Sequence, residues 1–142
     1  MRRLVCLLLC AAAACVGPAR TDRVYDGKAV DAAKAVRSAV ETARLAATTA
    51  PKKSTGQYLS IVLRDAEEEA DAASVAFDSI QPPSPASEKL HEALSSLIER
   101  AVDALRALRI AVRRTELASL RVIARDLGDV TRGLASFVEA RE

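Results

Sequence analysis

One thiol, that of Cys15, stands in a context that suits covalent chemistry. The three cysteines of the chain, Cys6, Cys10 and Cys15, all lie within its first fifteen residues. Only Cys15 directly follows a run of small residues, which a signal peptidase requires before its cut. A cut before Cys15 exposes a lone thiol in an oxidising compartment, where such thiols are reactive, unless the sulfur is acylated. Cys15 is therefore the candidate for covalent modification of its sulfur.

The residues before this cysteine have the composition of a secretory leader. Arg2 and Arg3 make its start positive, and the eleven residues from Leu4 to Ala14 are apolar. A membrane-spanning helix needs roughly 20 apolar residues, so the stretch is too short to be one. The sequence predicts a cleaved signal peptide over 1–14.

The four residues Ala12, Ala13, Ala14 and Cys15 resemble the lipobox of bacterial lipoproteins, although Ala12 stands where that family prefers Leu. The whole chain looks like small Ala- and Arg-rich envelope lipoproteins of high-GC bacteria. The resemblance implies a lipidated cysteine and a short tether over 15–25, with the domain anchored to the outer face of the cell membrane. The alternative is an ordinary secretory cut, which leaves an extracytoplasmic, secreted protein without an anchor.

Catalytic and metal chemistry have few candidates. Glu88 and His91 have the Glu-x-x-His spacing of di-iron bundles, but such sites need two of these pairs and His91 is the only histidine. We expect His91 to be a surface residue. With one histidine and no cysteine after Cys15, no nucleophile–base pair is indicated. The sequence predicts no enzyme, no metal site and no cofactor.

An acidic cluster and a basic cluster are the remaining candidates for binding. The acidic residues are Asp65, Glu67, Glu68, Glu69 and Asp71. Consecutive residues of a helix point in different directions, so we interpret this cluster as a solvated face with arginine partners rather than as a cation site.

The basic cluster consists of Lys52, Lys53, Arg109, Arg113 and Arg114. In a four-helix arrangement these residues gather at the end opposite the anchor, and there they could contact an anionic wall polymer or the acidic face of an envelope protein. The other interpretation is local, because cations near a helix C-terminus stabilise its dipole by about 0.3–1 kcal/mol.

Charge and aromatic content argue against nucleic acid as a partner. The chain has 21 Lys and Arg against 19 Asp and Glu, and removal of Arg2 and Arg3 with the leader makes the domain neutral. Only four aromatic side chains are present, Tyr25, Tyr58, Phe77 and Phe137, so no stacking platform for bases is indicated.

Apolar residues recur every three or four positions in four segments, which are rich in strong helix formers. We predict helices over about 26–49, 55–79, 85–112 and 116–140. With short links these give an all-α fold, an antiparallel up-down-up-down four-helix bundle over 26–142 that follows the cleaved signal peptide.

Helix boundaries follow from a few residues. Pro82 and Pro83 prevent continuation of a helix, and Ser84 before Pro85 has the pattern of an N-cap. The break near Thr115 has no Pro or Gly. It is predicted because one continuous helix would leave half its length without partners.

Alanine-rich seams on the first two helices indicate close packing with little room for a cavity. Gly128 and Gly133 in the last helix allow close packing or a bend. The sequence thus favours a non-enzymatic interaction or scaffold role in the cell envelope. The alternative function is a small-ligand-binding or sensor-like bundle, for which Thr131 is the candidate buried polar group.

Overall fold

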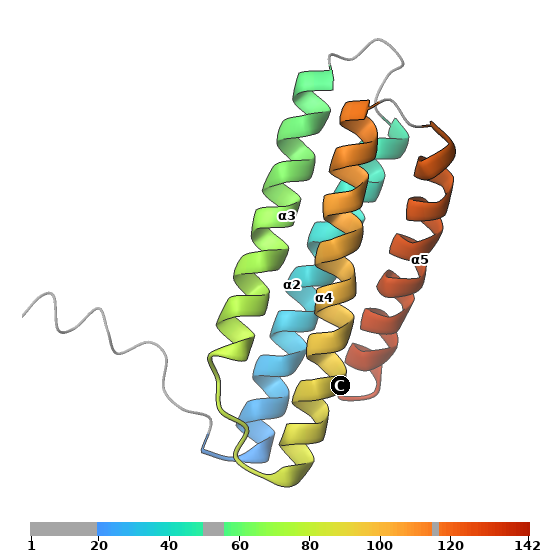
Figure 1. The fold of residues 1–142 in the computed structure, drawn as a ribbon. Coiled ribbons are helices and arrows are strands. Elements are labelled where there is room, and N and C mark those ends of the chain that lie inside the picture. Colours follow the sequence, from blue (N-terminus) through green and yellow to red (C-terminus); the bar gives the residue numbers. More distant parts are fainter. Residues whose placement is uncertain (1–19, 50–55, 115–116) are drawn as a thin grey trace, which may run out of the picture.

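The structure is a computed structural model that describes residues 20–49, 56–114 and 117–142. These residues form four helices and no strand. The bounds are Asp22–Thr49 for α2, Gly56–Asp78 for α3, Pro85–Arg114 for α4 and Leu117–Glu139 for α5. The prediction of an all-α, four-helix chain is confirmed, while the signal peptide over 1–14 and Cys15 lie outside the described residues (Figure 1).

Two helices begin at hydroxyl caps. The Ser84 Oγ accepts the backbone N–H of Ser87 at 3.2 Å, as the Ser84-Pro85 pattern predicts, because the first turn of a helix has donors without helical acceptors. At α2, Thr21 Oγ1 accepts the N–H of Val24 at 3.3 Å. This second cap explains why α2 begins at Asp22 rather than near residue 26.

The last two helices, α4 and α5, are separate. α4 ends at Arg114, α5 begins at Leu117, and the two pack alongside one another (Figure 1). Their contact is close at Gly133, where an added Cβ would lie 3.0 Å from Cδ2 of Leu97. Glycine at this position thus permits close packing of α5 on α4, one of the two roles that we expected.

The core lies along the axis of the four helices. α2 supplies mainly small buried residues to it, Ala29, Ala33, Ala39 and Ala43 among them. The largest fully buried side chains come from all four helices and are Tyr25, Val36, Val40, Leu63, Phe77, Leu94, Ile98, Leu105, Leu127, Val130 and Leu134.

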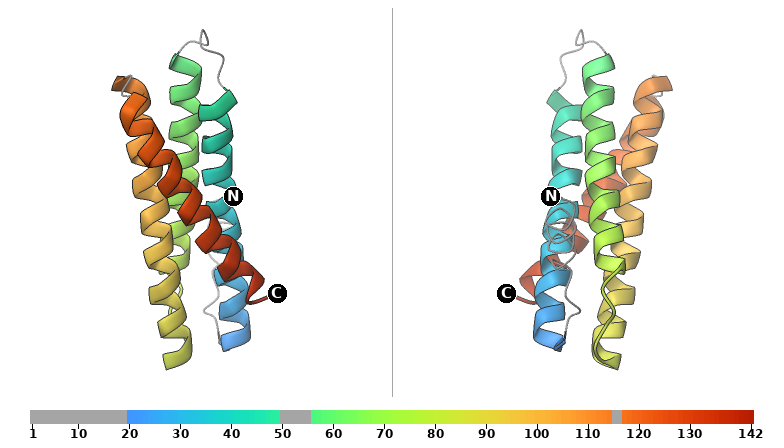
Figure 2. Two further views of the ribbon diagram at one scale, coloured as in Figure 1. Left: turned by 90° about the vertical axis from the view of Figure 1, so that its right-hand side faces the viewer. Right: turned by 90° about the vertical axis from the view of Figure 1, so that its left-hand side faces the viewer.

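The four helices are not arranged as a regular square. α2 packs against each of the other three helices, whereas the described parts of α3 and α5 make no contact. Alanines along α2 allow α2 and α4 to meet across the centre. Figure 2 shows α5 crossing obliquely, from beside the end of α4 to beside the start of α2. Within the described residues no helix is both long and apolar enough to cross a membrane.

Candidate functional site

The basic residues expected at one end of the molecule have different surroundings. Lys52 and Lys53 lie outside the described residues. Arg113 and Arg114 are exposed in the last turn of α4, where they line a hollow of about 270 Å³ together with Ile110. The predicted contact with an anionic partner would therefore fall on the hollow that these two arginines line.

Arg109 points instead to α3, where it binds Glu67. Its Nε donates to Oε2 of Glu67 at 2.6 Å and its Nη2 to Oε1 at 3.4 Å, while Nε of Arg106 donates to Oε1 at 3.2 Å. Glu67 is only 8% exposed. The expectation of a wholly solvated acidic face is therefore wrong for Glu67, whereas Asp65, Glu68 and Glu69 are exposed.

This arrangement keeps Glu67 ionised. The hydrogen bond from Arg109 is the main cause that lowers the pKa of Glu67, and it outweighs the opposing effect of burial. The same hydrogen bond raises the pKa of Arg109. Three charged groups thus join α3 to α4, so the principal task of Arg109 is to compensate a buried carboxylate.

A second polar cluster surrounds His91, at the junction of α2, α3 and α4. The Tyr25 hydroxyl lies 2.6 Å from Nδ1 of His91, and Oδ1 of Asp78 lies 3.6 Å from its Nε2. The imidazole stacks on Phe77 with 4.9 Å between ring centroids. The side chain of His91 is 24% exposed, so the histidine that we expected at the surface is partly buried at this junction.

The phenol of the His91 cluster is buried and protonated. Burial, with a contribution from the charge of Asp78, raises the pKa of Tyr25 to about 12, so the phenol keeps its proton. Tyr25 is fully buried, and Ser95 donates a hydrogen bond to Asp78 at 3.0 Å. A phenol with no exposed surface cannot reach a substrate.

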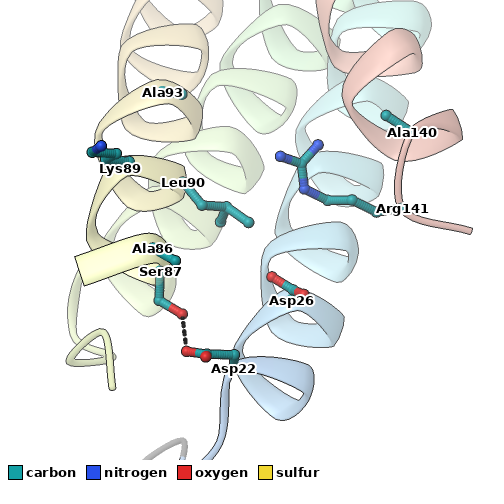
Figure 3. Close-up of a pocket in the computed structure, with 9 residues that line it drawn as sticks. All are labelled: Asp22, Asp26, Ala86, Ser87, Lys89, Leu90, Ala93, Ala140 and Arg141. Atoms are coloured by element: carbon teal, nitrogen blue, oxygen red, sulfur yellow. Dashed lines mark hydrogen bonds between the residues drawn. The ribbon is translucent and has the colours of Figure 1, made fainter. Parts of the chain in front are cut away.

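An open groove of about 490 Å³ lies between the start of α2, the start of α4 and the end of α5 (Figure 3). It exists because α5 turns away from α4 towards α2 at this end (Figure 2). The residues that line it are Asp22, Asp26, Ala86, Ser87, Lys89, Leu90, Ala93, Ala140 and Arg141. Its volume lies within the range of small-ligand sites.

The two aspartates of the groove differ in their hydrogen bonding. Asp22 accepts the hydroxyl hydrogens of Ser84 at 2.6 Å and of Ser87 at 2.7 Å on the same oxygen, Oδ1. These two hydrogen bonds, that from Ser84 first, lower the pKa of Asp22. Asp26 is half-buried and has no hydrogen-bond or ion-pair partner for its side chain among the described residues.

The cation nearest the end of α5 is held in place by its own helix. Arg141 Nη1 donates to the backbone oxygen of Phe137 at 3.0 Å, and its guanidinium lies 3.8 Å from the centroid of the Phe137 ring. Figure 3 shows this guanidinium reaching from α5 towards α2 and α4, on the side where Asp26 lies. The groove therefore has carboxylates on α2 and a fixed cation on α5.

The other polar candidates are satisfied internally. Thr131 Oγ1 donates to the backbone oxygen of Leu127 at 2.7 Å, so its hydroxyl hydrogen is already used within α5. In the described part of the chain no buried side-chain polar atom lacks a hydrogen-bond partner, and no group of three or more His, Cys, Asp or Glu residues could hold a metal ion.

The sequence analysis did not find the groove. Its only local signal is the placement of Ala86, Ala93 and Ala140 near helix ends, and that pattern also suits close packing. Comparison with family models, curated proteins and solved structures gave no match.

Proposed function

We propose that the chain is a lipid-anchored extracytoplasmic protein whose role in the cell envelope is to bind other molecules, without catalysis. The observation that carries the proposal is Cys15, which directly follows the small residues at the end of an apolar leader. Acylation of Cys15 would anchor the domain to the outer face of the cell membrane. Bacterial lipoproteins carry more than one acyl chain, and a single chain alone binds a bilayer only reversibly.

The short distance along the chain from Cys15 to the first helix supports a position close to the bilayer. α2 begins at Asp22, seven residues after Cys15. An extended chain of that length spans at most about 25 Å. The start of α2 would therefore lie near the lipid headgroups, and the exposed arginines at the end of α4 would face away from the membrane (Figure 1).

The intact mass of the membrane-associated protein tests the anchor. A chain that starts at Cys15 and carries diacylglycerol or more is expected, and a Cys15→Ala variant must lose that added mass. A protein without lipid mass, found in the soluble fraction, would contradict the anchor and leave the secreted form.

Charge reversal tests the contact at the far end. Arg113→Glu with Arg114→Glu is expected to reduce association with an anionic wall polymer or an acidic envelope protein, because the hollow beside Ile110 would lose its positive rim. The matched control reverses Arg23 and Lys28, which lie near the start of α2 and have no ion-pair partner among the described residues. If both double variants lose the same amount of association, the contact depends on net charge and not on this surface.

The proposal includes the finer topology, an up-down-up-down antiparallel bundle. Two contacts support it. Asp22 at the start of α2 is bound by Ser84 and Ser87 at the start of α4, as expected if two intervening turns bring the chain back. Along α3 the partners run backwards in α4, since Glu67 binds Arg106 whereas the later Asp78 lies beside His91.

The second candidate function is small-ligand binding. The groove of about 490 Å³ with its half-buried, unpaired Asp26 favours it, although the sequence predicted little room for a cavity. Both functions are compatible in one molecule, because the groove and the exposed arginines lie at opposite ends of α4 (Figure 1).

A further inference from the structure

Asp26 is the group in the groove that most needs a partner. Its carboxylate is half-buried and has no cation or donor within reach in the described chain. Asp22 lies one helical turn before it on the same side of α2, and like charges at this spacing repel. A ligand that brings a positive, hydrogen-bonding group between these two aspartates would relieve the repulsion and satisfy Asp26.

The opposite side of the groove favours an anion. Arg141 lies across from Asp26, whereas the exposed Lys89 points to the outer side of α4, away from Arg141 (Figure 3). Arg141 is already oriented by the carbonyl and ring of Phe137, so little side-chain entropy remains to be lost on binding. The complement to this charge pattern is a molecule with a cation at one end and an anion at the other.

The rest of the groove is apolar. Leu90, Ala86, Ala93 and Ala140 also line it, and they have no donor or acceptor in their side chains. A short hydrocarbon link between the cation and the anion suits such a lining. A primary ammonium suits the carboxylate side better than a quaternary one, because it donates three hydrogen bonds.

The groove also lies at the end of the molecule where the lipid would be attached. Asp22 is the first residue of α2, and the tether of at most about 25 Å would hold it near the headgroups. We propose that this groove binds the headgroup of an aminophospholipid, with its ammonium on Asp26 and Asp22 and its phosphate on Arg141. Only the choice of a membrane lipid rests on the proposed function, since the charge pattern is independent of it.

Titration with soluble O-phosphoethanolamine tests the groove itself. The mature protein, purified in detergent without phospholipid, is followed by the methyl resonances of Ala86, Ala93 and Ala140. Saturable shifts of these three methyl groups are expected. O-phosphocholine should bind at least about fivefold more weakly, because its trimethylammonium donates no hydrogen bond. Absence of saturable shifts with O-phosphoethanolamine overturns the proposal.

Matched substitutions test the assignment of the two sides. Asp26→Asn and Arg141→Gln are each expected to weaken O-phosphoethanolamine binding at least about fivefold. Their controls are Asp31→Asn on α2 and Lys28→Gln, which remove charges outside the groove from side chains without partners among the described residues. Binding that is unaffected by both groove substitutions, or equally weakened by the controls, overturns the assignment.

Lipid nanodiscs distinguish a membrane ligand from a free one. Phosphatidylethanolamine in a phosphatidylcholine nanodisc should reproduce the methyl shifts, and phosphatidylcholine alone should not. If glycine or alanine causes the shifts and phosphatidylethanolamine does not, the proposal of a lipid ligand is wrong and the ligand is a free zwitterion. The lipid on Cys15 is tested separately, by the intact mass of the protein. Failure of the anchor and failure of ligand binding in the groove therefore give different results.

Discussion

The hydroxyl of Tyr25 lies 2.6 Å from Nδ1 of His91 and joins the first turn of α2 to α4. The phenol keeps its proton, and the other ring nitrogen of His91, Nε2, lies 3.6 Å from Oδ1 of Asp78. Two residues separated by 66 positions therefore fix each other's orientation at the junction of three helices.

Loss of this pair should destabilise the protein. Tyr25→Phe removes the hydroxyl and is expected to lower the free energy of unfolding by about 0.5–1.5 kcal/mol. His91→Ala leaves a buried hydroxyl without its hydrogen-bond partner and removes the stacking on Phe77, so about 2–4 kcal/mol is expected. Urea unfolding measures both, with the exposed Tyr58→Phe as the control. The idea fails if all three variants unfold at the same urea concentration.

Alkaline pH should separate the two tyrosines of the chain. The pKa of Tyr25 is raised from 10 to about 12, so folding stabilises the protonated phenol. That stabilisation is present below pH 10 and is lost as the pH rises towards 12. In a Tyr58→Phe variant only Tyr25 absorbs as phenolate, and its ultraviolet titration should centre near pH 12 and coincide with loss of helical circular dichroism. A midpoint near pH 10 in the folded protein would contradict the buried hydrogen bond.

Acidic pH should weaken the link between α3 and α4. The pKa of Glu67 is lowered on folding, so its contribution is fully present above the ordinary value of 4.5 and is lost as the pH falls through the lowered value. Glu67→Gln is expected to cost about 1.5–3 kcal/mol at pH 7 and less at pH 3. Denaturant unfolding at both pH values measures this difference.

Glu68→Gln is the matched control for this prediction. Glu68 is exposed, and its only ion-pair partner among the described residues is the exposed Arg64, at 3.5 Å, so its loss should change stability by less than about 1 kcal/mol. An equal effect of the two substitutions at pH 7, or an effect of Glu67→Gln that is the same at pH 3, would show that the buried pair is not what the acid disrupts.

The two glycines of α5 should respond differently to alanine. At Gly128 an added Cβ meets only Nη1 of Arg132, at 3.6 Å, so Gly128→Ala should gain up to about 1 kcal/mol of helix propensity. At Gly133 the Cβ would lie 3.0 Å from Leu97, and the required shift should remove most or all of that gain. Thermal unfolding compares them. A larger gain at Gly133 than at Gly128 would mean that α4 and α5 are less closely packed there.

Local patterns predicted the helices well because their causes act within one or two turns. The cap at Ser84 depends on residues three positions apart, and the apolar stripes that include Leu94 and Leu134 depend on the helical repeat. The separation of α4 from α5 was predicted without any Pro or Gly, from the need of a long helix for partners along its whole length.

The features that the sequence analysis missed depend on how helices rotate and cross. Glu67 can be buried because Arg106 and Arg109, about 40 positions later in the sequence, bind its carboxylate from the neighbouring helix. The spacing of apolar residues does not indicate that a carboxylate is buried at this position. His91 meets Tyr25 across 66 positions. The groove depends on the oblique course of α5, which no residue pattern encodes locally (Figure 2).

The hydrogen bonds from Ser84 and Ser87 to Asp22 have a mechanical consequence. They tie the first residue of α2 to the start of α4, a helix whose buried side runs along much of its length. A pull on the chain just before α2 is therefore shared by two helices instead of unwinding the first turn of one. If the proposed tether holds the domain at a membrane, the end that bears the load is the end that these serines reinforce.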